Sequence, residues 1–192
     1  MKKTLKQDFF DRPALTVARE LIGKYLVRRV HGKEMALLIT ETEAYAGPHD
    51  LACHSRVGKT ARNAAMWGPP GSIYVYFTYG MHWMLNLVVR EEGYGSAVLI
   101  RALTPDTTFQ HSAECENVVR LDGPGRLTKA LKIDKTLNGK KLGREAELWV
   151  EGRGVVVRAR DIKRTPRIGI AYAGSYVLKP WRFVLKSKRA RT

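Results

Sequence analysis

The segment Glu34-Met-Ala-Leu-Leu-Ile-Thr-Glu-Thr-Glu-Ala-Tyr45 is rich in apolar and β-branched residues and contains neither proline nor glycine. A run of this kind is typical of a β-strand. Residues 24–30 before it have a similar composition, and His31-Gly32-Lys33 separates the two segments as a turn. We therefore expect 24–30 and 34–45 to pair as a hairpin.

The second of these strands changes character along its length. If it stays regular, Leu37, Ile39, Glu41, Glu43 and Tyr45 share one face, because alternate residues of a strand point to the same side. That face is apolar at first and then acidic and aromatic. The pattern indicates a strand that leaves the core and ends in a cleft.

The remaining segments are assigned from local signals. Residues 13–23 predict a helix, with proline near its start and glycine just past its end. Glycine and proline in residues 46–71 predict a long loop with a short helix, and loops of that length are usually functional or disordered. A tight turn at Tyr79-Gly80 is expected to join strands 72–78 and 82–89. Further strands are expected at 96–103, 147–150, 155–159, 168–172 and 181–186, a polar irregular stretch at 104–122, and a helix after Gly123-Pro124-Gly125 that carries Leu127, Ala130 and Leu131.

These elements predict a single α+β domain with a curved, mostly antiparallel sheet or partial barrel and helices outside it. We expect the domain to span residues 1–186, followed by a basic tail at 187–192. A parallel dinucleotide-binding fold is unsupported, because no Gly-x-Gly-x-x-Gly opens a helix after the first strand.

The chain is strongly basic. Its 192 residues include 34 Lys and Arg against 18 Asp and Glu, a formal net charge of +16. Such a charge attracts polyanions, so nucleic acid is the first partner expected. An anionic membrane surface comes second, without a long basic amphipathic helix to support it. The N-terminus lacks a secretory signal, and no apolar run reaches the roughly 18–20 residues that span a bilayer.

The two cysteines, Cys53 and Cys115, cannot form a disulfide framework, which favours a reducing compartment. Cys53-His54 and His111 near Cys115 suggest metal binding only weakly, because neither has the spacing of a zinc site. We therefore expect neither a metal nor an organic cofactor.

Glu43 is the first candidate for chemistry. On its own, such a residue could be a solvated strand end or a salt-bridge partner. Tyr45 on the same face and His54-Ser-Arg56 a short loop away favour a carboxylate in a partly dry aromatic pocket, which is suited to act as a general base on water. Arg101 lies inside a strand and needs a partner, for which Glu41 or Glu43 is the natural choice.

Aromatic residues could form the rest of the pocket, although each could instead belong to the core. Tyr45 and Tyr76, expected on adjacent strands, could make two walls of a slot for a planar base, where stacking is worth about 1–3 kcal/mol per base. Tyr79 and Met81 at the hairpin tip should be exposed, like the wedges that enter stacked DNA. Asn86, in an apolar strand, is either bonded to backbone or a gate at the pocket floor.

Basic residues outside the strands are candidates for phosphate contacts, although any single one could simply be solvated. A glycine-rich helix start at 123–125 adds backbone N–H groups that favour anions. The candidates are Arg56, Lys59, Arg62, Arg126, Lys129, Lys135, Lys140 and Lys141.

Taken together and in order, these motifs resemble the alkyladenine (3-methyladenine) DNA glycosylase family, the mammalian-type methylpurine glycosylases. The resemblance covers nearly the whole chain, from Phe10-Asp-Arg-Pro13 to Lys179-Pro-Trp-Arg-Phe183. It implies a single mixed domain with a hairpin that faces DNA. Its most specific pieces are Glu41-Thr-Glu-Ala-Tyr45, His54-Ser-Arg56, Tyr74-Val-Tyr76, Tyr79-Gly-Met81, Asn86 and Arg101-Ala-Leu-Thr-Pro105.

The resemblance also implies roles for individual residues. Glu43 corresponds to the general base, and Arg101 and the backbone near Ile168 would help to place the water. Asn86 would discourage guanine by crowding its exocyclic amine. The other roles are stacking on the flipped base by Tyr45, His54 and Tyr76, filling of the gap in the duplex by Tyr79, and backbone hydrogen bonds to the base near Ala52 and His54.

The activity so implied is removal of 3-methyladenine, 7-methylguanine, hypoxanthine or ethenoadenine from duplex DNA. No lysine is placed by motif for a Schiff base, so we expect no strand cleavage. A monomer is expected, in the cytoplasm with the nucleoid if the source is bacterial and in the nucleus if it is eukaryotic. His82 departs from the family, which commonly has tyrosine after the Met81 position.

Two other functions compete with this one. A non-catalytic module that binds RNA or the ribosome would explain the charge equally well, but not the cluster of Glu43, Tyr45 and His54. A zinc-dependent nucleobase deaminase also flips bases, but the sequence lacks its His-x-Glu and Pro-Cys-x-x-Cys motifs.

Overall fold

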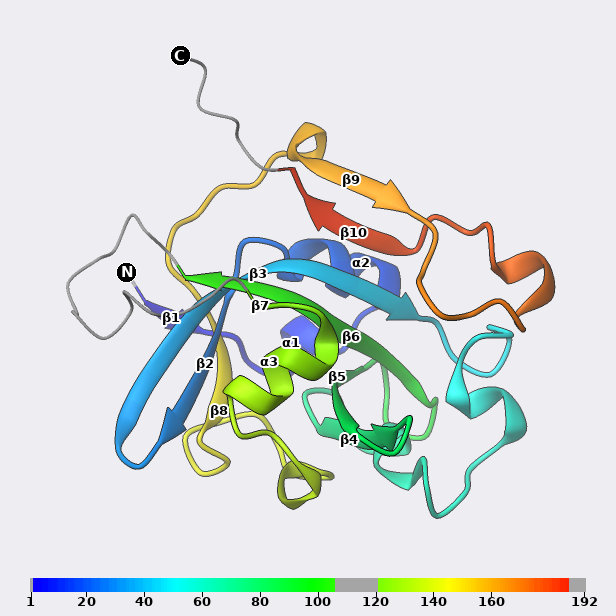
Figure 1. The fold of residues 1–192 in the computed structure, drawn as a ribbon, viewed down its shortest axis with the longest axis horizontal. Coiled ribbons are helices and arrows are strands. Elements are labelled where there is room, and N and C mark those ends of the chain that lie inside the picture. Colours follow the sequence, from blue (N-terminus) through cyan, green and yellow to red (C-terminus); the bar gives the residue numbers. More distant parts are fainter. Residues whose placement is uncertain (1, 106–120, 187–192) are drawn as a thin grey trace.

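The structure, a computed structural model, describes residues 2–105 and 121–186 (Figure 1). Its strands form one antiparallel sheet with the order β1-β8-β2-β3-β6-β5-β4, while β10 pairs with β3 and β9, and β7 with β6. The two ends of this path, β1 and β4, do not meet, so the sheet is not closed into a barrel. The strands are β1 Lys3–Thr4, β2 Tyr25–Val30, β3 Lys33–Tyr45, β4 Ile73–Thr78, β5 His82–Val89, β6 Ser96–Pro105, β7 Leu121–Asp122, β8 Leu148–Gly152, β9 Ile162–Thr165 and β10 Arg182–Leu185.

Helices are few and short, as in the α+β domain that the sequence predicts. In Figure 1, α2 lies behind the sheet and α3 in front of it. The hydroxyl of Thr128 in α3 donates to the Trp83 carbonyl of β5, which fixes this helix to the sheet at 2.9 Å. The α-helices are α1 Gln7–Phe10, α2 Ala14–Leu21 and α3 Pro124–Ala130, and the 3₁₀ helices are His54–Val57, Ala64–Trp67, Lys135–Leu137, Ala159–Asp161 and Gly174–Tyr176.

A pair of irregularities lies where β3 crosses β6. Ile39 pairs with Leu103, Glu41 with Ala102 and Thr42 with Ile100, so each strand carries one extra residue here. An extra residue in a strand moves the residues after it to the opposite face. In β6, the extra residue is Arg101.

The prediction that Leu37, Ile39, Glu41, Glu43 and Tyr45 share one face was therefore wrong. Leu37 and Ile39 lie in the main core, and so does Ala44 beyond the bulge. Buried Thr42 is on the same side and donates to the Ala18 carbonyl of α2 at 2.8 Å. The bulge turns Glu43 and Tyr45 to the other side of the sheet, away from α2.

The hairpins and most strands lie where the sequence predicts them, but two predicted strands are absent from the described residues. Segment 155–159 has no edge to join, because β2 and β1 occupy both sides of β8. Segment 168–172 turns at Gly169, which has a φ of +77°, and the N–H of Ile168 is used by a side chain. The edge strand β9 lies between these two segments and was not predicted.

The long loop 46–71 contains two 3₁₀ helices instead of the single helix expected. His111 and Cys115, considered above as metal ligands, lie outside the described residues. Across residues 2–105 and 121–186, no helix is both long and apolar enough to cross a membrane.

Candidate active site

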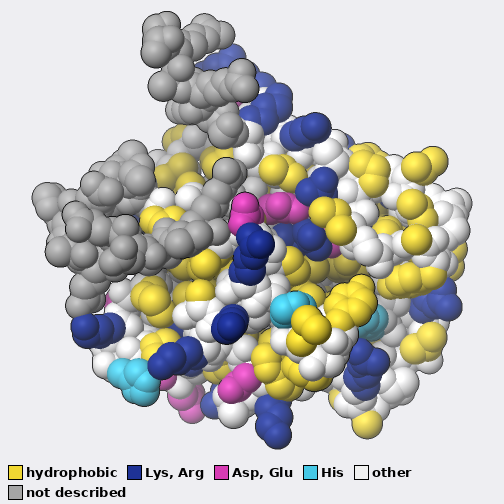
Figure 2. Space-filling view, viewed as in Figure 1, with side chains coloured by type: hydrophobic (Ala, Val, Ile, Leu, Met, Phe, Trp, Pro, Cys, Tyr) yellow, Lys and Arg dark blue, Asp and Glu magenta, His cyan; other side chains and the backbone are white. Residues whose placement is uncertain are grey.

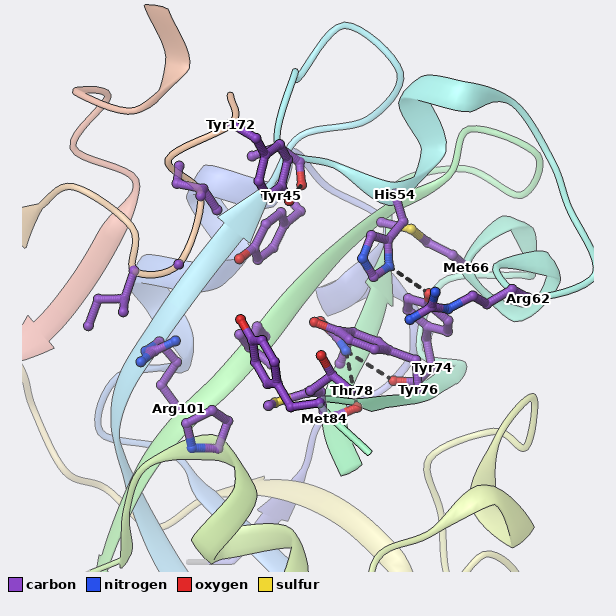
Figure 3. A pocket seen from close by; sticks show the side chains of 18 residues that line it. Tyr45, His54, Arg62, Met66, Tyr74, Tyr76, Thr78, Met84, Arg101 and Tyr172 are labelled. Carbon is purple, nitrogen blue, oxygen red and sulfur yellow. Dashed lines mark hydrogen bonds between the residues drawn. The ribbon is translucent and has the colours of Figure 1, made fainter. Parts of the chain in front are cut away.

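A cavity of about 330 Å³ opens on the face of the sheet opposite α2 (Figure 3). Its volume lies at the lower end of the range for small-ligand pockets, about 300–1,000 Å³. Tyrosine is the most frequent residue of the lining, and the tyrosine hydroxyls, His54, Asn86 and two arginines add polar groups to it. The residues that line it are Tyr45, Ala52, His54, Arg62, Met66, Tyr74, Tyr76, Thr78, Tyr79, Met84, Asn86, Leu99, Arg101, Pro124, Ile168, Gly169, Ile170 and Tyr172.

The aromatic walls stand on two sides of the cavity. Figure 3 shows Tyr45 with Tyr172 on one side, and His54 with Tyr74 and Tyr76 on the other. The rings of His54 and Tyr76 pack edge to face, with centroids 4.6 Å apart. The expectation that Tyr45 and Tyr76 lie on adjacent strands was wrong, because β6 and β5 separate β3 from β4.

Glu43 lies directly behind this lining, with no exposed side-chain surface. Its Oε1 accepts a 2.8 Å hydrogen bond from the Ile168 N–H and lies 3.5 Å from Nε of Arg101. Its Oε2 accepts a 3.0 Å bond from the Tyr45 hydroxyl. The three donors line the cavity themselves, so the carboxylate is one layer behind the wall.

Burial raises the pKa of Glu43, and the nearby Arg101 charge and the hydrogen bonds from Ile168 and Tyr45 oppose this rise. Desolvation is the largest of these effects. A carboxyl group that is buried but held by donors is typical of functional sites, where proton affinity is adjusted by the surroundings.

Arg101 is fixed by a second carboxylate. Its Nε donates to Oε1 of Glu41 at 2.9 Å, and Nη1 of Arg182 on β10 donates to the same oxygen at 2.8 Å. Both of the partners considered for Arg101, Glu41 and Glu43, are therefore within reach. The cation faces the cavity while its charge is shared between them.

His54 is held by Tyr74. Its Nδ1 and the Tyr74 hydroxyl are 2.8 Å apart and share one hydrogen bond. Burial and the charge of Arg62 lower the pKa of His54, and burial raises the pKa of Tyr74 well above its usual value. Near neutral pH, His54 is therefore a neutral ring and Tyr74 stays protonated.

Asn86 is bonded to backbone, which is one of its two interpretations, and it also lies at the cavity wall. Its amide nitrogen donates to the carbonyls of Tyr74 and Met84, each at 3.2 Å, so the side chain is bonded to backbone. The same residue, buried to 3% exposure, lines the cavity. Its amide is thus fixed in place at the cavity wall.

The tip of the β4–β5 hairpin is exposed, as the sequence predicts. Tyr79 is 77% exposed and Met81 68% exposed. Tyr79 has a φ of +53°, and its side chain lines the cavity while Met81 does not. His82 packs against Gly125, where a methyl group would lie 2.8 Å from the imidazole. His82 thus meets the start of α3 and does not line the cavity.

The basic candidates lie on the surface, and Figure 2 shows Lys and Arg side chains spread over this face of the molecule. Arg62 both lines the cavity and donates to the Phe77 carbonyl at 3.2 Å. Arg126 pairs with Asp122 at 3.1 Å, while both side chains stay largely exposed. The other candidates are exposed and do not line the cavity: Arg56, Lys59, Lys129, Lys135, Lys140 and Lys141.

Three residues at or behind the cavity were given no role from the sequence. Asp50 and Arg167 are both fully buried and form a two-bond ion pair behind Tyr45, at 2.6 and 2.8 Å. They are 117 positions apart, so no local motif connects them. Tyr172 on the cavity wall was assigned to a strand and given no role.

Within the described ranges 2–105 and 121–186, no three His, Cys, Asp or Glu side chains gather as a metal site. The arrangement instead offers an aromatic slot, a buried carboxylate with fixed donors and a basic surface.

The sequence matches the family described as Methylpurine-DNA glycosylase over residues 8–189. Among its relatives is a protein of Methanocella arvoryzae, 46% identical, with 97% of this chain and 96% of that protein covered. A relative from Myxococcus xanthus is 42% identical over 96% of this chain and 91% of its own length. The names of both assign them to the 3-methyladenine DNA glycosylases. The chain therefore belongs to the methylpurine-DNA glycosylase family, whose members are DNA glycosylases that hydrolyse N-glycosyl bonds.

Proposed function

We propose that this protein removes damaged purines from duplex DNA by hydrolysis, and that Glu43 activates the water. The observation that carries the proposal is the buried Glu43 carboxylate, held by Ile168, Arg101 and Tyr45 directly behind an aromatic cavity. The substrates proposed are 3-methyladenine, 7-methylguanine, hypoxanthine and ethenoadenine. The product is DNA with an abasic site.

The cavity suits a base that has left the stack. Unstacking costs a few kcal/mol, least for damaged or mispaired bases. The base would lie between Tyr45 on one side and His54 with Tyr76 on the other. Stacking of about 1–3 kcal/mol per base offsets part of the cost. Tyr79, exposed at the hairpin tip, would occupy the gap left in the duplex.

Bond cleavage then follows the general course of glycoside hydrolysis. The electron pair of the C–N bond leaves with the base, and positive charge develops on the sugar. The ionised Glu43 stabilises that charge and takes a proton from the water whose oxygen bonds to the sugar carbon. Arg101 and the Ile168 backbone would place this water.

The structure adds a condition to this step. Glu43 has no exposed surface, and the Tyr45 hydroxyl covers Oε2. Water is therefore proposed to reach the carboxylate from the cavity side, while the Tyr45 hydroxyl stays bonded to Oε2.

Base release is proposed to differ between charged and neutral substrates. A cationic alkylated purine leaves as a neutral molecule without further help, whereas hypoxanthine needs a proton. His54 is a poor acid for this purpose near neutral pH, because burial lowers its pKa and keeps the ring neutral. Asn86 would restrict the slot by crowding the exocyclic amine of guanine.

We propose that the reaction stops at the abasic site. A Schiff base to the sugar requires a lysine at the reacting centre, and no lysine is among the described residues that line the cavity. We also propose that the protein acts as a monomer.

The experiment is a single-turnover assay on duplex oligonucleotides that carry one hypoxanthine, or that have been treated with a methylating agent. Free base is quantified, and strand breaks are scored with and without hot alkali. Base release with breaks that appear only after alkali is expected. Tight binding to both substrates without release would contradict the proposal and favour a non-catalytic nucleic-acid-binding module.

A further inference from the structure

Behind Tyr45, the buried ion pair of Asp50 and Arg167 joins two segments of the site. Nη1 and Nη2 of Arg167 donate to the two carboxylate oxygens of Asp50 at 2.6 and 2.8 Å. Nη1 also donates to the Ala44 carbonyl at 2.8 Å. This two-point geometry fixes the guanidinium in direction as well as in position.

Asp50 also organises the loop that follows β3. Its Oδ2 accepts a hydrogen bond from the Ala46 N–H and its Oδ1 one from the Ala52 N–H, each at 3.1 Å. Ala52 lines the cavity. The carboxylate therefore holds part of the cavity wall as well as Arg167.

Arg167 reaches the other parts of the site. It precedes Ile168, whose N–H is bonded to Oε1 of Glu43 at 2.8 Å. Its guanidinium carbon lies 4.8 Å from the centroid of the Tyr45 ring. A cation over an aromatic face is attracted by the ring, so Arg167 favours one position of Tyr45.

Stability alone is a poor explanation for this arrangement. Taking two charges out of water is costly, and an apolar pair of similar volume is often at least as stable. Nε of Arg167 is also buried and has no hydrogen-bond partner within the described residues. A role in the site therefore explains the buried pair better than a contribution to the stability of the core does.

We propose that Asp50 and Arg167 are positioning residues for the reaction: together they set the Ile168 N–H and the Tyr45 ring around Glu43. The inference rests on the proposed role of Glu43 and adds to it the two residues that hold its donors. The two donors that the pair sets, the Ile168 N–H and the Tyr45 hydroxyl, favour the ionised form of Glu43, so loss of their alignment should raise the pKa of this carboxyl.

The test uses a double variant, Asp50→Asn with Arg167→Gln, which removes both charges but keeps groups that can hydrogen-bond to each other. The matched control is Glu151→Gln with Arg153→Gln. That pair joins Glu151 of β8 to Arg153 just after it; it is also largely buried, its two side chains are 2.8 Å apart, and neither residue lines the cavity. Thermal unfolding of both variants measures any general loss of stability.

Two readouts are taken. The first is the titration of the Glu43 carboxyl by ¹³C NMR in glutamate-labelled protein, with the signal assigned by its loss in Glu43→Gln. The second is the pH dependence of the single-turnover rate of base release. In the double variant we expect the midpoint of the Glu43 titration to move to higher pH. The acid limb of the pH–rate profile, where the rate falls as Glu43 becomes protonated, should move with it. The rate at pH 7 should fall about tenfold or more. The control is expected to match the wild type.

An unchanged Glu43 titration in a folded double variant would overturn the inference. If the double variant fails to fold, Arg167→Lys decides: it keeps the charge but lacks the planar pair of nitrogens that bonds to the two Asp50 oxygens. A rate loss together with a shift of the Glu43 titration to higher pH in this variant supports positioning, and a wild-type rate with a wild-type titration contradicts it. Absence of base release by the wild type would refute the proposed function instead, and the NMR titration would still decide whether the pair acts on Glu43.

Discussion

The hydroxyl of Tyr45 donates a 3.0 Å hydrogen bond to Oε2 of Glu43, two residues earlier on the same face of β3. Burial and the Glu43 charge raise the pKa of Tyr45 well above its usual value, so this hydroxyl remains a donor at any working pH. The residue proposed to stack on the base is thus also bonded to the residue proposed to activate water. The proposed base-stacking residue and the proposed general base are therefore linked by this one hydrogen bond.

Removing this hydroxyl should impair the reaction at low pH. The bond favours the ionised form of Glu43, so Tyr45→Phe raises the pKa of the carboxyl while it keeps the ring. A hydrogen bond to a charged group contributes about 1.5–3 kcal/mol. This corresponds to a loss of about tenfold or more in the rate at acidic pH, where a larger fraction of Glu43 is protonated in the variant. Single-turnover rates across pH would show it.

Tyr172→Phe is the control for this variant. Tyr172 also lines the cavity, but its hydroxyl makes a longer bond, 3.4 Å, to the Ala52 carbonyl. The acid limb of Tyr172→Phe should coincide with that of the wild type. A similar limb in Tyr45→Phe would show that the Tyr45 hydroxyl does not act on Glu43.

Stability should also depend on Glu43 in a defined direction. Its pKa in the folded state is raised above the ordinary value of 4.5. Its contribution is therefore fully present below pH 4.5 and is lost as pH rises through the folded pKa. We expect the melting temperature of Glu43→Gln, relative to wild type, to increase over this range. Melting curves at several pH values test this, and a constant or falling difference would contradict the raised pKa.

A substitution at the hairpin tip should change the flipping of the damaged base and leave the free energy of unfolding nearly unchanged. Tyr79 is 77% exposed, so Tyr79→Asn, which tolerates the positive φ at this position, should change the free energy of unfolding by less than about 0.5 kcal/mol. The fluorescence increase of 2-aminopurine placed beside a lesion should shrink. Leu178→Ala, at a residue 79% exposed that does not line the cavity, serves as control. An unchanged fluorescence response in Tyr79→Asn would refute the wedge.

Asn86 should control selectivity at a modest cost in stability. Asn86→Ala removes the two bonds to the Tyr74 and Met84 carbonyls and should destabilise the fold by about 1–3 kcal/mol. The rate of guanine release relative to hypoxanthine release should rise, because space opens for the exocyclic amine. Asn138→Ala, which removes the amide that accepts from the Val75 N–H, should destabilise without this change. Equal selectivity in the two variants would exclude the gate.

The sequence predicted the parts of this molecule that depend on local signals. The β2–β3 and β4–β5 hairpins, the helix that begins at Ala14, and the exposed Tyr79 follow from turn residues and apolar patterns. Tyr45, Tyr76, Asn86 and Arg101 on the cavity wall were singled out from their own sequence context, and the family resemblance, which the comparisons confirm, added Ala52 and Ile168.

What the sequence could not predict depends on pairing between distant segments. The bulge that turns Glu43 away from Ile39 exists only because β3 and β6 pair with shifted registers. Segment 155–159 has strand-like composition, but no edge of β8 remains for it. The Asp50–Arg167 pair joins residues in separate loops, neither of which carries a recognisable motif.

Glu43→Gln removes the carboxylate that is proposed to activate water while it keeps the shape of the side chain. Single-turnover base release is measured on a hypoxanthine duplex, with binding to the same duplex measured alongside. A loss of rate of at least about 100-fold with DNA affinity retained is expected, the scale typical of a general base. Equal rates for the variant and the wild type would remove Glu43 from the mechanism.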